Sequence, residues 1–225
     1  MARTLTPSAE FSEITDGQID KAVALYRAML IKHRSELASE PAQHVLGQPE
    51  LVGEMVGVLR KRVEAVSNII VRHVTSDGRT GDESIRDLES TRYNLDADAK
   101  KLLRSKSFVA TNGVTYKLAV IRGDEFEDSD RTNANIWAEG ERRGWQKPAI
   151  EQAALLRELV SDEEIERMGL WALIVMHEPV TDSDGYPYLL GLFRYDVGRW
   201  LYACFGYPGY RWHREYGFVF LVPQV

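Results

Sequence analysis

The sequence predicts an α+β protein, in which an N-terminal antiparallel helical hairpin precedes a mainly antiparallel sheet domain with one or two helices. Three observations carry this prediction: two apolar stripes at helical spacing before residue 75, strand-like apolar runs after residue 107, and turn-forming residues between those runs. The predicted parts are the hairpin over residues 14–75, a connecting segment with short helices over 76–106 and an α+β sheet domain over 107–225.

The first helix of the hairpin is predicted to begin near Thr15, because Gln18 three residues later completes a capping box. Its apolar stripe recurs at steps of four and three residues and consists of Ile19, Val23, Tyr26, Leu30, His33 and Leu37. Residues 39–48 contain Pro41 and Gly47, which break the helical period and predict the loop of the hairpin.

The second helix is predicted over residues 49–74, with Pro49 at its first position, where no backbone N–H is needed. Its stripe follows the same steps and consists of Val52, Val56, Leu59, Val63, Val66, Ile70 and Val74. Two matching stripes predict that the helices pack antiparallel around Tyr26 and Leu59.

The rest of the chain is predicted to alternate short helices and strands. Residues 85–93 and 96–106 are expected to be helices, and the dipeptide Asn112-Gly113 predicts a tight hairpin turn between strands at 108–110 and 114–121. A loop is expected over 123–135. Further helices are expected over 148–160 and 161–167, and strands over 170–176, 187–193, 200–205 and 217–222.

Charge and cysteine content narrow the class of protein. The 225 residues carry a net charge of −6, and residues 123–166 hold 5 basic and 13 acidic side chains, a local net of −8. Broad electrostatic binding to nucleic acid or anionic lipid is therefore not expected. The single cysteine, Cys204, favours the cytoplasm, and no apolar run approaches the roughly 18 residues that span a membrane.

No motif identifies a reaction, and no cofactor is predicted. The sequence contains no Gly-rich phosphate loop, no His-Glu-x-x-His, no nucleophile elbow and no Cys-x-x-Cys. Two acidic clusters have ligand types that suit a divalent cation, although loop formation explains both. One is a calcium-loop-like series of Asp128, Asp130, Thr132 and Glu139, and the other consists of Glu178, Asp182 and Asp184.

The most unusual segment, which we call the aromatic-Arg stretch, covers residues 193–216, where nine Phe, Tyr and Trp residues alternate with arginines. Such side chains suit a protein interface, stacking on unpaired bases, or the core of a sheet. The residues predicted to bind a partner are Arg199, Tyr207, Tyr210, Arg211, Trp212 and Arg214.

These patterns favour a non-catalytic cytosolic interaction protein, adaptor-like or inhibitor-like, that binds a protein partner through the aromatic-Arg stretch and can form homo-oligomers through its helical hairpin. Such motif-poor chains include small proteins of mobile elements. The first alternative is a single-stranded nucleic-acid-binding protein that uses the same residues. The second is a metal-dependent hydrolase whose site is formed by Glu178, Asp182 and Asp184.

Overall fold

The computed structural model describes residues 14–67, 69–195 and 198–223, without the side chains of residues 65–67. The chain divides into two compact units, residues 1–63 and residues 64–225. The fold is α+β, as predicted. Within the described part of the chain, no helix has the length and apolar character needed to cross a membrane.

The described part of the first unit consists of helices, and none of residues 14–63 is buried. They are α1 (Asp16–Lys32), η1 (Arg34–Glu36), α2 (Ser39–Leu46) and α3 (Pro49–Ser67), the last of which runs on into the second unit. The capping box of α1 is confirmed, because Thr15 Oγ1 accepts the Gln18 N–H at 3.3 Å and Gln18 Oε1 accepts the Thr15 N–H at 2.9 Å. Residues 39–48 were expected to form a loop, but α2 occupies most of them.

None of residues 14–64 is buried, so the predicted antiparallel packing of the two stripes is not confirmed. Tyr26 is 43% exposed and Leu59 is 45% exposed. The periodic stripes lie on α1 and α3, and in the described residues their side chains stay exposed to water.

The predicted second helix is wrong beyond Ser67, because the chain then forms strand β1 (Ile70–Asp77). Residues four apart share a face in a strand as well as in a helix, so Ile70 and Val74 fit both patterns. Both are buried in the sheet, and the neighbouring β-branched residues favour an extended backbone. The side chain of Val66, another member of the predicted stripe, lies outside the described part.

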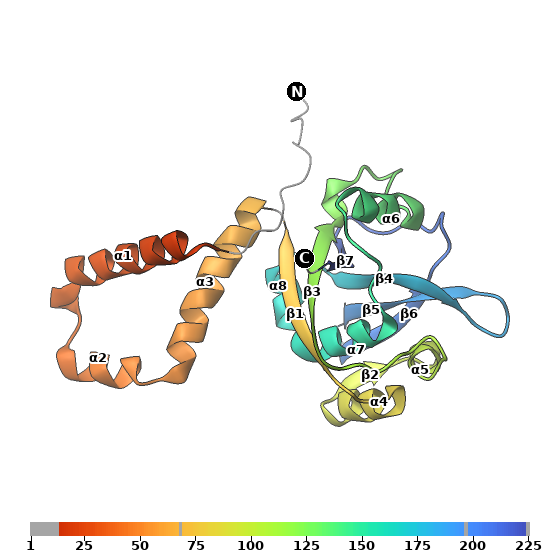
Figure 1. Cartoon of the computed structure of the whole chain (residues 1–225), viewed down its shortest axis with the longest axis horizontal. Helices are drawn as coiled ribbons and strands as arrows, with labels where there is room; N and C mark the ends of the chain where they lie inside the picture. The colour runs from red at the N-terminus through yellow and green to blue at the C-terminus, as the bar shows by residue number, and fades with distance from the viewer. Residues whose placement is uncertain (1–13, 68, 196–197, 224–225) are drawn as a thin grey trace. The chain divides into compact units, whose positions relative to one another are not determined.

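The second unit is built on one mixed sheet (Figure 1) with the strand order β1-β3-β7-β4-β5-β6-β2. Its other strands are β2 (Tyr93–Leu95), β3 (Asn112–Arg122), β4 (Ala172–Thr181), β5 (Pro187–Tyr195), β6 (Gly198–Phe205) and β7 (Tyr216–Val222). The pairs β4–β7 and β2–β6 are parallel and the other four pairs are antiparallel, so the sheet predicted to be mainly antiparallel is mixed. Strands β1 and β2, from before residue 107, belong to this same sheet.

The predicted hairpin at Asn112-Gly113 is wrong, because β3 starts at Asn112 and pairs with the distant β1. The positive φ of +70° at Gly113 is used at the beginning of the strand. Gly78, also at positive φ, donates its N–H to the Thr111 carbonyl at 2.8 Å and joins the two strands there. A turn-forming dipeptide thus marks a strand end without specifying which strand follows.

The helices of this unit are α4 (Gly81–Ser90), α5 (Ala97–Leu103), η2 (Gly123–Glu125), α6 (Asn133–Arg142), α7 (Ile150–Leu159) and α8 (Asp162–Arg167). The predicted helices at 85–93, 96–106, 148–160 and 161–167 correspond to α4, α5, α7 and α8. Helix α6 was not predicted. Its N-cap, Thr132, and its first helical residue, Asn133, lie within the loop that was expected over residues 123–135.

The two faces of the sheet are covered differently. Helices α4, α5, α7 and α8 contribute to the main core on one face of the sheet. Leu173 of β4, Leu190 of β5 and Leu201 of β6 belong to this core. Helix α6 lies apart from α4, α5 and α7 (Figure 1) and packs its Gly140 against the Phe220 ring of β7. The second face is therefore covered over β7 and β4 and partly open over β5 and β6.

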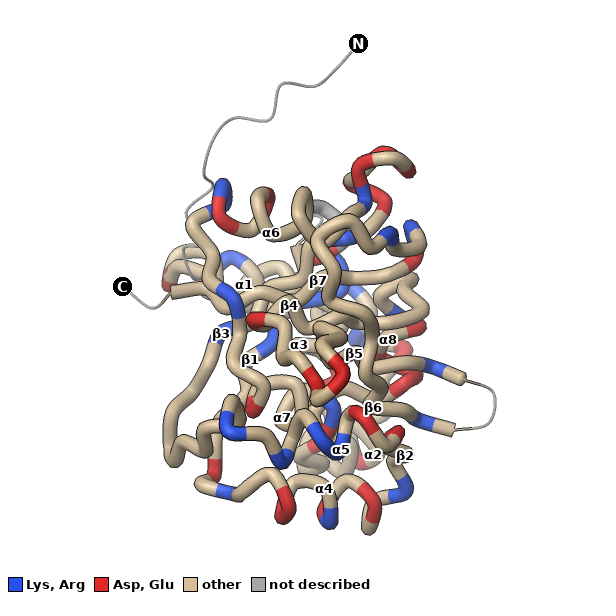
Figure 2. Tube along the Cα trace, turned by 90° about the vertical axis from the view of Figure 1, so that its right-hand side faces the viewer, with Lys and Arg blue, Asp and Glu red and all other residues tan. Residues whose placement is uncertain are grey.

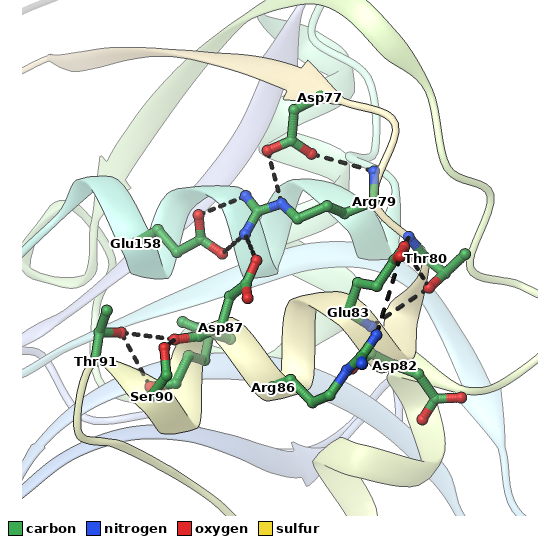
Figure 3. A network of polar contacts seen from close by, with 11 residues as sticks. Asp77, Arg79, Thr80, Asp82, Glu83, Arg86, Asp87, Ser90, Thr91 and Glu158 are labelled. Carbon is green, nitrogen blue, oxygen red and sulfur yellow. Dashed lines mark hydrogen bonds and ion pairs between the residues drawn. The ribbon is translucent and has the colours of Figure 1, made fainter.

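A four-residue ion network (Figure 3) ties the end of β1 to α4 and α7. Arg79, just after β1, contacts Asp77 at 2.6 Å and Asp87 of α4 at 2.7 Å. Its guanidinium also makes two bonds to the Glu158 carboxylate of α7, at 2.6 and 2.9 Å. Hydrogen bonding to these carboxylates, first of all Glu158, raises the pKa of Arg79, and the bond from Arg79 lowers the pKa of Asp77.

Candidate partner-binding groove

The open part of the second sheet face forms a groove of about 350 Å³, which we call the aromatic groove. It lies over β5 and β6 and is bordered by the start of α5 and by the segment that joins β6 to β7. Its lining residues are Asp96, Asp98, Tyr188, Phe193, Tyr195, Tyr202, Ala203, Cys204, Phe205, Tyr210, Arg211, Trp212, His213 and Tyr216. Aromatic side chains supply most of this wall.

The rings of the wall pack on one another in both stacked and perpendicular pairs. Phe193 and Tyr195 stack with their centroids 5.6 Å apart, and Tyr188 stacks on Phe205 at 5.6 Å. Tyr210 meets Trp212 edge to face at 4.7 Å. Such contacts hold each ring in place, so the wall presents flat faces whose ordering cost on binding is small.

The segment after β6 is held by polar residues that precede and begin α6. The Trp212 indole N–H donates to Asn133 Oδ1 at 2.7 Å, and the Asn133 amide donates to the Tyr207 carbonyl at 2.8 Å. The buried Arg131 guanidinium donates to the Trp212 carbonyl at 3.3 Å. These bonds near the start of α6 therefore hold the outer wall of the groove, including Tyr210 and Trp212, in a fixed position.

A glycine in β5 allows the rings to lie close to the sheet. Gly191 is paired with Tyr202 of β6, and a Cβ built on it would be 2.6 Å from the Phe193 ring. A real Cβ does not tolerate that distance, so any larger residue here would displace Phe193 from the groove wall.

The tyrosine hydroxyls of the groove are free to bind a partner. Among the residues that the structure describes, none of the hydroxyls of Tyr188, Tyr195, Tyr202, Tyr210 and Tyr216 has a hydrogen-bond partner. Burial raises the pKa of Tyr216 to about 12 and raises the pKa of Tyr195, Tyr202 and Tyr210. At neutral pH these groups are protonated and can each donate one hydrogen bond.

The charges in the groove have mixed sign. Asp96 caps α5 and accepts the backbone N–H of Ala99 and of Ala203, and burial raises its pKa. Asp98 pairs with Lys101 at 2.7 Å, whereas Arg211 makes no ion pair within the described part of the chain. Figure 2 shows both acidic and basic residues along α4 and α5.

Cys204 lines the groove but does not suit nucleophilic chemistry. The thiol is buried, and this burial raises its pKa well above the ordinary range. Since the thiolate is the reactive form, the side chain is an inert part of the wall at neutral pH.

The structure brings three of the predicted partner-binding residues together and places three elsewhere. Tyr210, Arg211 and Trp212 line the groove, although Trp212 is only 6% exposed. Arg199 pairs with Glu163 at 3.1 Å and lies over the Tyr93 ring, outside the groove. Two further residues, Tyr207 and Arg214, are exposed next to the groove without lining it.

The acidic clusters have local structural roles. Asp182 accepts the N–H groups of Asp184 and Tyr186 in the β4–β5 turn, and Glu178 pairs with Lys147 at 2.6 Å. Asp128 pairs with Arg131 at 2.7 Å. Within the described residues, no group of three or more His, Cys, Asp or Glu side chains is arranged to hold a metal ion.

Sequence reasoning missed Asp96, Asp98 and Tyr188 as members of the site. Asp96 and Asp98 are recognisable in the sequence as the start of a helix, but their contact with β6 depends on the parallel pairing of β2 with β6. No local pattern encodes that pairing. Comparison of the chain with protein families, with curated proteins and with solved structures finds no match, so function is argued from the groove itself.

Proposed function

We propose that this protein is a non-catalytic, cytosolic interaction protein, adaptor-like or inhibitor-like, that holds a protein partner in the aromatic groove. One observation carries the proposal: an anchored wall of aromatic rings borders a groove in which Tyr195, Tyr202 and Phe205 are exposed, and five tyrosine hydroxyls have no partner among the described residues. Tyr, Trp and Arg are the usual anchors of protein interfaces, since they combine a large rigid surface with polar groups. The cytosolic location rests on the single free cysteine.

Single-stranded nucleic acid is the second candidate, because Arg211 adjoins rings on which bases could stack. The carboxylates of Asp96 and Asp98 count against it, since they repel phosphates in the same groove. The mixed charge therefore favours a protein partner.

Homo-oligomerisation through α1 and α3 is a separate proposal, supported by their exposed apolar stripes. Large contiguous apolar patches are uncommon on monomers. The charged residues of helix α1 are Asp16, Asp20 and Lys21 in its first half and Arg27 and Lys32 in its second half, so the net charge changes from negative to positive along the helix. An antiparallel neighbour of the same polarity, such as another α1, would bring opposite charges together, and sedimentation of the full chain tests this.

The binding proposal is tested by affinity capture from lysate with and without nuclease treatment. The variant Tyr202→Ala with Arg211→Ala removes one ring and one cation from the groove. The control, Tyr186→Ala with Arg214→Ala, removes the same groups from exposed positions outside it. We expect a captured protein that survives nuclease, is lost in the groove variant and persists in the control.

Capture that is equal in both folded variants would contradict the proposal. A signal that disappears after nuclease treatment would favour the nucleic-acid candidate instead.

A further inference from the structure

We infer that the segment held in the aromatic groove is a proline-rich peptide in the extended polyproline II conformation, with a basic residue beside the prolines. This inference rests on the proposed function and specifies its partner. It follows from three features of the groove: a blocked strand edge, rigid rings with unpaired hydroxyls, and two carboxylates.

The edge of β6 beside the groove is not available for adding a strand. Residues 93–95 pair with residues 199–201, and the Asp96 carboxylate takes the Ala203 N–H at 3.1 Å. A partner in β conformation would need a row of free backbone groups at that edge. An extended segment must therefore lie across the face of the rings, where side-chain groups are its only hydrogen-bond partners.

A polyproline II segment matches such a face. It has no internal hydrogen bonds, so its carbonyls point outward as acceptors, and prolines bring no backbone N–H that would be left unpaired. The hydroxyls of Tyr195, Tyr202 and Tyr210 are unpaired in the described structure and can donate to those carbonyls. Hydroxyl donors without a regular backbone ladder thus favour proline over a general extended sequence.

The ring faces accessible to pyrrolidine rings are those of Tyr195, Tyr202 and Phe205, which are 39 to 42% exposed. Tyr202 and Tyr216 pack edge to face on the buried Phe193 ring, at 6.0 and 5.7 Å, which fixes their orientation. Polyproline II has three residues per turn and rises about 3.1 Å per residue, so every third proline returns to the wall after roughly 9 Å. Because wall and peptide are both ordered before binding, little conformational entropy is lost.

The charges select a basic neighbour for the prolines. Asp96 and Asp98 line the groove together. The half-buried Asp98 makes its one ion pair within the described part of the chain with Lys101, from the next turn of α5. An arginine of the peptide can compete with Lys101 for the Asp98 carboxylate, because its planar guanidinium donates two parallel hydrogen bonds. A phosphate backbone in the groove would instead be repelled by both carboxylates.

The experiment measures fluorescence anisotropy of labelled peptides with the full chain. The probes are ten prolines, the same peptide with one internal arginine, a Gly-Ser decamer and a ten-nucleotide oligo(dT). We expect saturable binding of both proline peptides, tighter binding of the arginine form, and no saturable binding of the other two probes.

Variants locate the binding. Tyr202→Ala should weaken decaproline binding at least tenfold and Tyr202→Phe should weaken it by less, because the ring face remains. Tyr186→Ala, outside the groove, should leave binding unchanged. Asp98→Asn should remove only the advantage of the arginine peptide. The unfolding midpoint of each variant is measured alongside, so that a loss of folding is not read as a loss of binding.

Absence of saturable decaproline binding by the folded chain would overturn this inference. If lysate capture were still lost in the groove variant, the proposed protein-binding function would stand and only the peptide class would fall. Preference for oligo(dT) would overturn both the peptide inference and the protein-binding function. An unchanged decaproline affinity in Tyr202→Ala would show that the peptide does not bind in the aromatic groove.

Discussion

Residues 14–64 and residues 70–222 use similar apolar side chains with opposite results. In the first region none of the described residues is buried, although α1 and α3 carry regular stripes. In the second region, side chains from strands and helices far apart in the sequence form one core, which includes Val74, Leu156 and Val219. An apolar stripe therefore specifies a helix, but a core requires other elements to converge on it.

The same contrast separates the two faces of the sheet. One face is closed by four helices, whereas α6 leaves the aromatic rings of β5 and β6 open. Within the described residues, the exposed apolar stripes and the exposed rings are two surfaces that could receive a partner. Substitutions in the closed core should therefore cost more stability than substitutions at these two surfaces.

The largest effect is expected for Leu156→Ala in α7. Leu156 is 1% exposed within the main core, so its truncation leaves a cavity and should lower the free energy of unfolding by about 2 to 5 kcal/mol. Chemical denaturation measures this loss. A change below about 0.5 kcal/mol would mean that α7 does not pack on the sheet as described.

The second effect is a loss of stability as the pH falls from about 6.5 to about 4. His177 is fully buried; its Nε2 accepts the Leu190 N–H at 3.0 Å, so the neutral ring carries its proton on Nδ1 and donates to the Glu178 carbonyl. Burial lowers the pKa of His177 to about 4. In this window the unfolded chain binds a proton that the native chain does not, and the expected loss is roughly 3 kcal/mol.

Denaturation at several pH values measures this loss, with His177→Gln as the comparison. The variant should lose most of the pH dependence between 6.5 and 4.5, the range above the titration of ordinary carboxylates. A wild-type stability that stays flat there would show that His177 is accessible to protons in the native state.

An intermediate effect is expected for the ion network of Figure 3. Arg79→Met keeps the apolar stem but leaves three carboxylates facing one another, and should cost about 1 to 3 kcal/mol, less at high salt. Arg86→Met is the matched control, since its 4.0 Å contact with Glu83 lies at an exposed surface and should contribute under about 0.5 kcal/mol. Equal losses of unfolding free energy in Arg79→Met and Arg86→Met would show that the Arg79 network contributes no more than an exposed ion pair.

The smallest effect is expected for Leu59→Ala in α3. Leu59 is 45% exposed in the single chain, so at low protein concentration the change should stay within about 0.5 kcal/mol. If stripes pair between copies, the same substitution should shift sedimentation toward the monomer at high concentration. A core-like loss in dilute, monomeric protein would instead mean that α1 and α3 pack within one chain.

Local signals in the sequence were sufficient for most helix starts and for the strands of the second half. The cap at Thr15 acts within three residues, so the sequence alone reveals it, and the caps at Asp96 and Ser161 lie at the first residues of the predicted helices. Partners of strands are not local: Asn112 pairs with Asp77 across two helices and a strand, which its turn-like composition cannot show. The mixed sheet order was unpredictable for the same reason.

The candidate site was found in part because many of its rings are neighbours in sequence. Tyr210, Arg211 and Trp212 follow one another, but the sequence does not state which arginines face the groove. Arg199 points to Glu163 and Tyr93, because alternate residues of β6 face opposite sides of the sheet. Asp96 reaches the groove from 107 residues before Ala203, through contacts of the folded chain.

Photo-crosslinking from inside the groove tests the protein-binding function most directly. A benzophenone amino acid replaces Tyr202, which is 39% exposed in the groove wall, or Tyr186, which is exposed outside it. We expect a nuclease-resistant protein adduct from position 202 and not from position 186. Adducts with nucleic acid alone, or the same protein adduct from both positions of folded protein, would contradict a protein-binding groove.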